Sequence, residues 1–363
     1  MKHTISTLGS HSALDVCDGA KKEGYNTLVV AQRGREKTYL GQYKTRKRGT
    51  KEIGVVDEVL LVNKFSEMVN PETINLMKKR NCIFVPNRSF SVYVGYDAIE
   101  NKFPIPIFGN KFLLRAEERD APKNQYYLMN KAGVRTPQEL EKPGKIDRLA
   151  IVKVSEAQRS YERAFFLAST PMEYEEKSEE LLRAGKITQE GLKKARIEEF
   201  VIGAQFNLNF FYSPIHEELE LLGIDTRRQT NLDGFLRMPA DVQVQALRRV
   251  QPRNIEVGHI ACTLRESLLE QVFDLGERFV DAVGKEYPKG LIGPFALQCA
   301  IVEENGKEEF VCFDVSFRMP GSPGTRFTPY SEYLFRESIS FGRRIAIEVK
   351  EAEKKKKMEK ITS

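Results

Sequence analysis

Residues 293–325 read GPFALQCAIVEENGKEEFVCFDVSFRMPGSPGT. Two runs rich in Val, Ile, Phe and Cys flank the dipeptide Asn305-Gly306. Asn-Gly between apolar runs is the strongest short-range signal of a β-hairpin. We therefore expect two antiparallel strands joined by a tight turn.

Each expected strand carries one polar residue among apolar neighbours. These are Gln298 and Asp314, and Ser316 and Arg318 follow Asp314 at period two. A strict two-residue turn would pair Gln298 with Phe313 and put Asp314 on the other face, so a shared face requires a bulge or a three-residue loop. With it, the hairpin presents an amide, a carboxylate, a hydroxyl and a guanidinium together, which suits a metal-bound phosphate. The alternative is a partly exposed Asp314 paired with Arg318.

Composition limits the class of protein. The chain has 363 residues and a formal net charge of +6, with basic runs at residues 44–51 and 350–360. This length predicts two or three α/β lobes. We find no apolar run of membrane-spanning length and no signal-peptide segment, so we expect a cytoplasmic protein that does not bind membranes. The basic runs lack interleaved aromatic residues, which argues against a nucleic-acid partner. The five cysteines are scattered in apolar runs and predict free thiols rather than a zinc site.

Two polar turns stand out in the N-terminal third, where expected strands (4–8, 27–31, 55–62, 82–85) alternate with helices. Gly9-Ser10-His11-Ser12 leads from a strand into a helix, where free N–H groups and the helix dipole favour an anion. The alternative is that Ser10 or Ser12 only caps the helix. Ser89 lies in the second such turn. Because turns after parallel strands meet at one sheet edge, His11 and Ser89 can face one ligand.

The rest of the chain is predicted as two further lobes. We expect a buried strand at 149–153 that ends in Lys153, strands at 197–201, 206–212 and 218–224, and a long amphipathic helix at 267–287. The predicted boundaries are 1–120, 121–203 and 204–363, with the last dozen residues frayed.

This order of elements resembles the ATP-grasp ligases. More narrowly, six motifs resemble those of the archaeal formate-dependent ligase of purine synthesis: TLGSHSAL (7–14), VP with SF (85–90), FGN (108–110), ELLGID (220–225), RESLL (265–269) and GPF (293–295). That family makes formylaminoimidazole carboxamide ribonucleotide from aminoimidazole carboxamide ribonucleotide, formate and ATP. The resemblance implies an α/β fold that is α+β in its C-terminal half, with a Rossmann-like lobe before a two-lobed ATP-grasp unit.

The resemblance also implies site residues. The residues that would hold the ribonucleotide are His11, Ser89, Ser10 and Ser12. Those that would bind ATP are Lys153, the adenine hinge Glu199, Phe200 and Val201, and Asn207, Gln229 and His259. The metal ligands, for Mg²⁺ or Mn²⁺, would be Gln298 and Asp314. The residues beside the transferred phosphoryl group would be Arg318, Ser316 and Arg228. The implied partners are the ribonucleotide, ATP and formate, and the chain is expected to form a homo-oligomer.

The chain departs from the family pattern around ATP. Residues 154–164 read VSEAQRSYERA where the family has a glycine-rich lid whose N–H groups approach phosphate. Arg159 and Arg163 can serve as phosphate donors instead. Tyr127 replaces a lysine expected in the helix before Gly133.

Three further positions differ: Gln229, His259 and Asp314 stand where the family has glutamate, asparagine and glutamate. Two alternatives therefore stay open. One is a catalytically degenerate relative that binds a purine precursor nucleotide in a regulatory or structural role. The other is an ATP-grasp ligase that joins a different carboxylate and amine, since fold does not fix substrate.

Overall fold

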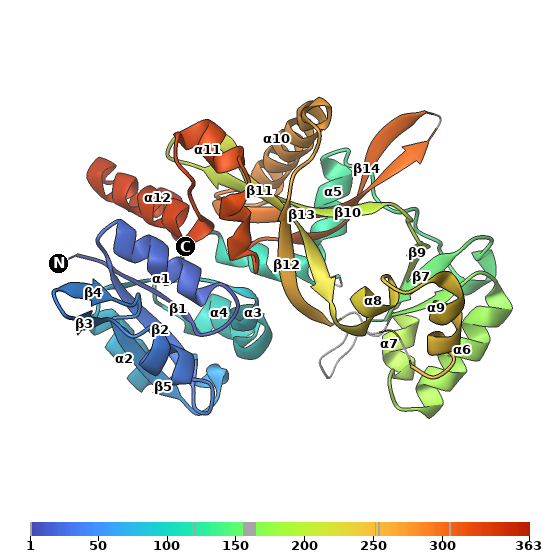
Figure 1. Cartoon of the computed structure of the whole chain (residues 1–363), viewed down its shortest axis with the longest axis horizontal. Coiled ribbons are helices and arrows are strands. Elements are labelled where there is room, and N and C mark those ends of the chain that lie inside the picture. The colour runs from blue at the N-terminus through green and yellow to red at the C-terminus, as the bar shows by residue number, and fades with distance from the viewer. Residues whose placement is uncertain (1, 120, 155–164, 251, 253–254, 305) are drawn as a thin grey trace.

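Three sheets and one two-stranded ribbon organise the chain in this computed structural model (Figure 1). The structure describes all residues except 1, 120, 155–164, 251, 253–254 and 305. In Figure 1 the N-terminal lobe is blue, a small lobe at the right is green, and a central sheet lies between them. Within the described residues, no helix is long and apolar enough to cross a membrane.

The N-terminal sheet is parallel, in the order β5-β2-β1-β6. Its strands are β1 (Thr4–Leu8), β2 (Asn26–Gln32), β5 (Glu58–Val62) and β6 (Cys82–Val85). The predicted βαβ unit is confirmed. Since β1 also pairs with β6, the turns that follow these two strands lie at the same sheet edge.

Helices and short turns complete this lobe. They are α1 (Ala13–Lys22), η1 (Thr38–Gln42), η2 (Phe65–Val69), α2 (Pro71–Lys79), α3 (Arg88–Val94), α4 (Tyr96–Lys102) and η3 (Lys111–Glu117). The basic run at 44–51 folds into the ribbon of β3 (Arg46–Arg48) and β4 (Lys51–Ile53), whose side chains are largely exposed.

The small lobe has an antiparallel sheet in the order β8-β7-β9. Its elements are η4 (Pro143–Lys145), β7 (Ala150–Lys153), β8 (Phe165–Ala168), α6 (Pro171–Arg183), α7 (Gln189–Lys193) and β9 (Arg196–Glu199). β7 and β9 match the prediction. β8 was not predicted, because a four-residue strand carries too little pattern to be recognised.

The central sheet is antiparallel, in the order β12-β11-β10-β13-β14. Its strands are β10 (Ala204–Ser213), β11 (Glu218–Gln229), β12 (Glu256–Cys262), β13 (Gly293–Glu304) and β14 (Lys307–Ser316). One face carries apolar residues such as Leu208, Ile224 and Leu297, which are fully buried in a core shared with α5 (Gln125–Lys131) and α10 (Leu269–Glu286).

 

α10 matches the amphipathic helix predicted at 267–287. The opposite face of the sheet carries the polar residues of the candidate site.

The hairpin of β13 and β14 contains the bulge that a shared face requires. Cys299 lies opposite Cys312, as a two-residue turn dictates, but Gln298 lies opposite Asp314. The register shift between Gln298 and Cys299 leaves Phe313 as the extra residue. The prediction that Gln298 and Asp314 share a face is therefore confirmed.

The remaining helices follow the strands of the central sheet. They are α8 (Thr230–Phe235), α9 (Ala240–Leu247), η5 (Glu266–Leu268), η6 (Pro323–Phe327), α11 (Tyr330–Phe335), α12 (Phe341–Lys355) and α13 (Met358–Ile361).

The prediction of a frayed C-terminus is wrong. Ile361 is fully buried, and the backbones of Ser363 and Ile107 exchange two hydrogen bonds of 3.0 and 2.9 Å. The basic residues misled the prediction, because they lie on the solvent side of α12 while Ile345 and Val349 face the core.

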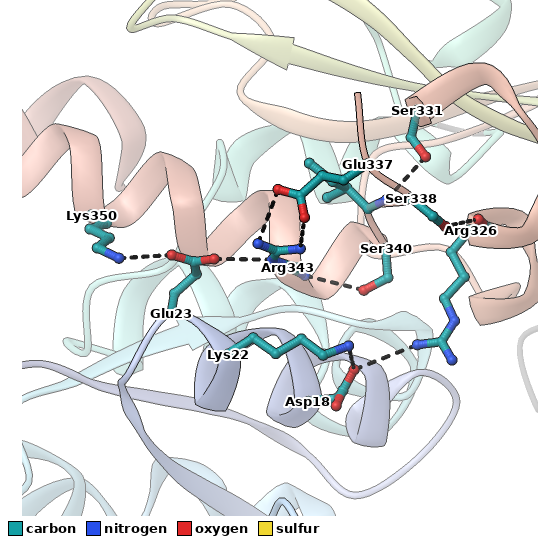
Figure 2. A network of polar contacts seen from close by, with 11 residues as sticks. Asp18, Lys22, Glu23, Arg326, Ser331, Glu337, Ser338, Ser340, Arg343 and Lys350 are labelled. Atoms are coloured by element: carbon teal, nitrogen blue, oxygen red, sulfur yellow. Dashed lines mark hydrogen bonds and ion pairs between the residues drawn. The ribbon is translucent and has the colours of Figure 1, made fainter. Parts of the chain in front are cut away.

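α12 packs closely on α1 of the N-terminal lobe (Figure 2). A Cβ on Gly342 would lie 2.0 Å from the carbonyl oxygen of Asp15, so a glycine is needed at this contact. Around it, Glu23 accepts hydrogen bonds from Arg343 at 3.1 Å and Lys350 at 2.8 Å. The C-terminal segment therefore ties the first lobe to the central sheet.

Candidate functional site

A row of four polar residues crosses the polar face of the central sheet. Asp225 on β11 lies opposite Asn207 on β10, which lies opposite Gln298 on β13, which lies opposite Asp314 on β14. Asp225 accepts hydrogen bonds from the amide nitrogens of Asn207 at 2.8 Å and Asn209 at 2.7 Å. The row is fixed by strand register, and all its members except Asp314 are buried.

Arg227 lies beside this row and contacts the hairpin. Its guanidinium donates to Gln298 Oε1 at 2.5 Å. Arg228 was predicted to lie beside the phosphoryl group, but it forms an ion pair of 3.1 Å with Asp233 on α8. Because side chains alternate along a strand, only one of two adjacent arginines can share a face with Asp225. Arg227 is that residue, and it was not predicted.

His259 on β12 is held between two carboxylates. Its Nδ1 lies 2.5 Å from Asp225 Oδ2, and its Nε2 lies 2.9 Å from Glu256 Oε1. Burial would lower the pKa of His259, but the hydrogen bonds and charges of Asp225 and Glu256 outweigh it and raise the pKa to about 9. Glu256 also pairs with Arg227 at 3.2 Å. Burial would raise the pKa of Glu256, but His259 and Arg227 lower it to about 2.

These contacts make folding stability depend on pH. The ordinary pKa of histidine is 6.5 and that of folded His259 is about 9, so its contribution is complete below pH 6.5 and is lost as the pH rises to 9. We expect the His259→Gln variant to lose less stability than the parent over this interval. Chemical denaturation at pH 6.5 and 9 measures the difference. Equal losses in both proteins would contradict the protonated state of His259.

His11 lies in the turn after β1, in the left-handed region at φ 44°. Although the residue as a whole is exposed, the protein around the ring desolvates it, and this, followed by the positive charge of Arg318, lowers the pKa of His11 to about 4. The imidazole is therefore neutral at physiological pH and can donate or accept a hydrogen bond.

The serines around His11 bind neighbouring turns. The Ser10 and Ser89 hydroxyls form a hydrogen bond of 2.8 Å, so the two predicted turns meet. Ser12 precedes α1 but makes no side-chain cap; its hydroxyl donates to the Pro320 carbonyl in the turn after β14. The N-terminal edge and the end of the hairpin strand are thus in direct contact.

Arg318 and Ser316 lie at this contact and are both buried. Glu117 in η3 accepts from the Arg318 guanidinium at 3.2 and 3.1 Å and from the Phe317 N–H at 2.9 Å. The alternative reading paired Arg318 with Asp314, whereas the ion pair of Arg318 in the described part of the chain is with Glu117. Glu117 was not predicted as a partner of Arg318, since it lies about two hundred positions away in the chain.

Lys153 ends β7 as predicted and is buried with a carboxylate partner. Its ammonium forms an ion pair with Glu198, whose side chain is almost fully buried, and donates to the Tyr126 hydroxyl at 3.1 Å. The Tyr126 hydroxyl also lies 3.4 Å from the carbonyl oxygen of Phe313, the bulge residue. Tyr126, rather than Tyr127, therefore links the small lobe to the hairpin.

The predicted adenine hinge follows β9. The N–H groups of Glu199 and Phe200 donate to Gln138 and Leu149 carbonyls at 2.9 Å, and Val201 follows in the chain. Nearby, a cavity of about 40 Å³ is bordered by Asn207 and Gln229, together with Arg227, Gln298 and Phe313. The lid sequence at 155–164, with Arg159 and Arg163, lies outside the described residues.

The hairpin carries oxygen groups of the kind that hard divalent cations bind. Gln298 and Asp314 place an amide oxygen and a carboxylate at directly opposed positions, although the amide oxygen accepts from Arg227 in this structure. No group of three His, Cys, Asp or Glu side chains suited to a metal occurs among the residues that the structure describes. Divalent cations such as Mg²⁺ are often held by one or two carboxylates, water and substrate phosphates, and Asp314 supplies one carboxylate.

Comparison with known proteins identifies the relatives of this chain. The family models that match are "Domain of unknown function (DUF1297)" at residues 173–363 and "Protein of unknown function (DUF1246)" at residues 5–140. The 5-formaminoimidazole-4-carboxamide-1-(beta)-D-ribofuranosyl 5'-monophosphate synthetase of Methanopyrus kandleri is 39% identical over 360 residues, which cover 99% of this chain and 95% of the relative.

Solved structures agree. The IMP biosynthesis protein PurP from Thermococcus kodakaraensis matches with a TM-score of 0.72 and 30% identity over 99% of this chain and 100% of that one. Phosphoribosylamine–glycine ligase from Thermotoga maritima shares the fold, with a TM-score of 0.55 and 15% identity over 89% of this chain and 70% of that one. The predicted ATP-grasp fold is confirmed. The chain belongs to the family of 5-formaminoimidazole-4-carboxamide ribonucleotide synthetases, which are ATP-grasp ligases.

Proposed function

We propose that this protein catalyses the ATP- and formate-dependent formylation of aminoimidazole carboxamide ribonucleotide, releasing ADP and phosphate. One observation carries the proposal. The strand that bears Asp314 runs directly into the turn at Pro320, which accepts a hydrogen bond from Ser12 beside His11. A site for a metal-bound phosphate thus adjoins a sheet edge suited to a ribonucleotide.

The proposed chemistry has two steps. A formate oxygen attacks the γ-phosphorus of ATP, and ADP leaves. The exocyclic amine of the ribonucleotide then attacks the formyl carbon, the phosphate leaves with the oxygen that came from formate, and the amine nitrogen loses a proton. Positioning and neutralisation of charge supply most of the rate enhancement in such reactions.

The chain's own residues would hold the phosphoryl group and metal. Gln298 and Asp314 would hold Mg²⁺ or Mn²⁺, which when bound neutralises phosphate charge. Arg318 is oriented by Glu117, and Arg227 lies at the hairpin, so both guanidinium groups are placed to bind phosphate oxygens. Ser316 would lie beside them. Arg228 has its ion pair with Asp233, so we assign the role given to it to Arg227.

The nucleotides would occupy the two sides of the hairpin. On the ATP side, Lys153 would contact a phosphate, Asn207 and Gln229 would border the nucleotide, and the hinge Glu199, Phe200 and Val201 would offer backbone groups to adenine. On the other side, Ser10, His11, Ser12 and Ser89 would hold the ribonucleotide. Because His259 lies near His11, we assign it to the ribonucleotide as well. We propose that residues 1–120, 121–203 and 204–363 act as ribonucleotide, lid and catalytic lobes, in the cytoplasm.

The direct assay combines purified protein, ATP, Mg²⁺, formate and the ribonucleotide. We expect ADP, phosphate and formylated ribonucleotide in equal amounts, and none when any substrate is left out. ATP hydrolysis that does not depend on formate, or ribonucleotide binding without turnover, would contradict the proposal and favour a degenerate relative.

Removing the His11 imidazole should weaken ribonucleotide binding. We expect His11→Ala to lose roughly 1 to 3 kcal/mol of binding free energy, because a polar group of the ribonucleotide is left without its hydrogen bond. Calorimetry measures the change, and His216→Ala is the control because His216 lies on the surface beside Glu351. Unchanged affinity in the His11 variant would make His11 a packing residue.

A further inference from the structure

Three polar side-chain atoms converge over Gly321, in the turn after β14. A Cβ on this glycine would lie 3.4 Å from His259 Nε2, 3.6 Å from His11 Nδ1 and 3.7 Å from Glu256 Oε1. The backbone of Gly321 lies outside the left-handed region, so the turn itself does not require glycine. We call this group of side chains, His11, Glu256 and His259 over Gly321, the Gly321 cradle.

The hydrogen-bonding capacity of the Gly321 cradle is specific. Glu256 is ionised, with one oxygen on His259 and the other on Arg227, so it can only accept. His11 is neutral, and its Nδ1 can donate. The cradle therefore offers a fixed acceptor next to a donor. A primary carboxamide, with an N–H and a carbonyl oxygen on one carbon, matches both.

Other groups fit less well. A carboxylate would place a second negative charge close to Glu256. An aminoimidazole with only a hydrogen atom in place of the carboxamide would leave Glu256 and His11 without a ligand partner. The cradle thus distinguishes among imidazoles by the group next to the reacting amine.

We propose that the Gly321 cradle binds the exocyclic carboxamide of the ribonucleotide, with Glu256 accepting from the amide N–H and His11 donating to the carbonyl oxygen. Glu256 and Gly321 then determine specificity. This inference rests on the proposed function, because it takes the substrate to be an aminoimidazole ribonucleotide. It adds a basis for choosing the carboxamide over its unsubstituted and carboxylate counterparts.

Calorimetry with three ribonucleotides tests the proposal: the aminoimidazole carboxamide, the unsubstituted aminoimidazole and the aminoimidazole carboxylate. We expect the protein to prefer the carboxamide by about tenfold or more. Gly321→Ala fills the cradle and should weaken carboxamide binding by about tenfold while changing affinity for the unsubstituted compound less than about twofold. Glu256→Gln should improve binding of the carboxylate relative to the carboxamide.

The matched control is Gly324→Ala in the same segment, where a Cβ would meet nothing within 4 Å. Equal affinity of the parent protein for the carboxamide and the unsubstituted compound would overturn the cradle, as would equal weakening of both by Gly321→Ala. Either result would leave the formylation reaction standing. If the parent protein binds none of the three ribonucleotides, the proposed function fails and the cradle fails with it.

Discussion

Replacing Asp314 by alanine is expected to lower turnover at least about a hundredfold while leaving ribonucleotide affinity unchanged. Asp314 supplies the carboxylate of the hairpin, opposite Gln298, and an amide alone binds Mg²⁺ weakly. The ribonucleotide edge at His11 and Ser89 belongs to another sheet, so its affinity should not depend on this carboxylate. Steady-state rates with Mg²⁺ and calorimetry with the ribonucleotide measure the two quantities.

The control for this experiment lies on the same strand. Glu308 is a half-exposed carboxylate near the tip of the hairpin that pairs with Arg265, so Glu308→Ala removes a charge far from the polar row. We expect its turnover to stay within about twofold of the parent. Turnover of the Asp314 variant at the same level would show that the hairpin is not the metal site.

Replacing Arg344 by methionine is expected to lower the free energy of unfolding by about 3 to 5 kcal/mol. The guanidinium lies 2.6 Å from Glu220 and 2.9 Å from Glu348, and all three side chains are nearly inaccessible to solvent. Without Arg344, two buried carboxylates lose their cation. Burial already raises the pKa of Glu220 against the opposing effect of Arg344, so the loss should shrink at acidic pH, where the carboxylates take up protons.

The adjacent Arg343 provides a matched control. It pairs with Glu23 and Glu337 in the surface network of Figure 2 and is partly exposed. Arg343→Met should therefore lower stability by no more than about 1 kcal/mol. Urea denaturation of both variants gives the comparison. Equal effects would mean that the buried cation does not hold α12 on the central sheet.

The part of the site predicted from sequence depends on local geometry. The Asn-Gly dipeptide in the sequence predicted the hairpin, and a shared face for Gln298 and Asp314 then required a bulge, which the structure contains at Phe313. The turns at Ser10 and Ser89 met because parallel strands place their ends at one edge. In these places a few neighbouring residues determine where a side chain points.

The residues that were not predicted are those whose contacts depend on which face of a helix or strand they occupy, or on partners far away in the chain. Arg227 and Arg228 are indistinguishable in sequence until the register of β11 is known. The sequence likewise does not show which of Tyr126 and Tyr127 contacts Lys153 and the hairpin, because neighbouring residues of a helix point in different directions. Glu256 was not predicted as a site residue, because its place beside Arg227 and His259 follows from the pairing of β12 with β11. The ordered C-terminus was missed because Ile361 finds its partners in the N-terminal lobe.

The proposed reaction is best tested by following an oxygen atom from formate into the released phosphate. Formate labelled with ¹⁸O is incubated with the protein, ATP, Mg²⁺ and the ribonucleotide, and the released phosphate is analysed by mass spectrometry. If formate is phosphorylated before the amine attacks, each phosphate carries one oxygen from formate. Phosphate without the label, formed alongside ADP, would contradict the account.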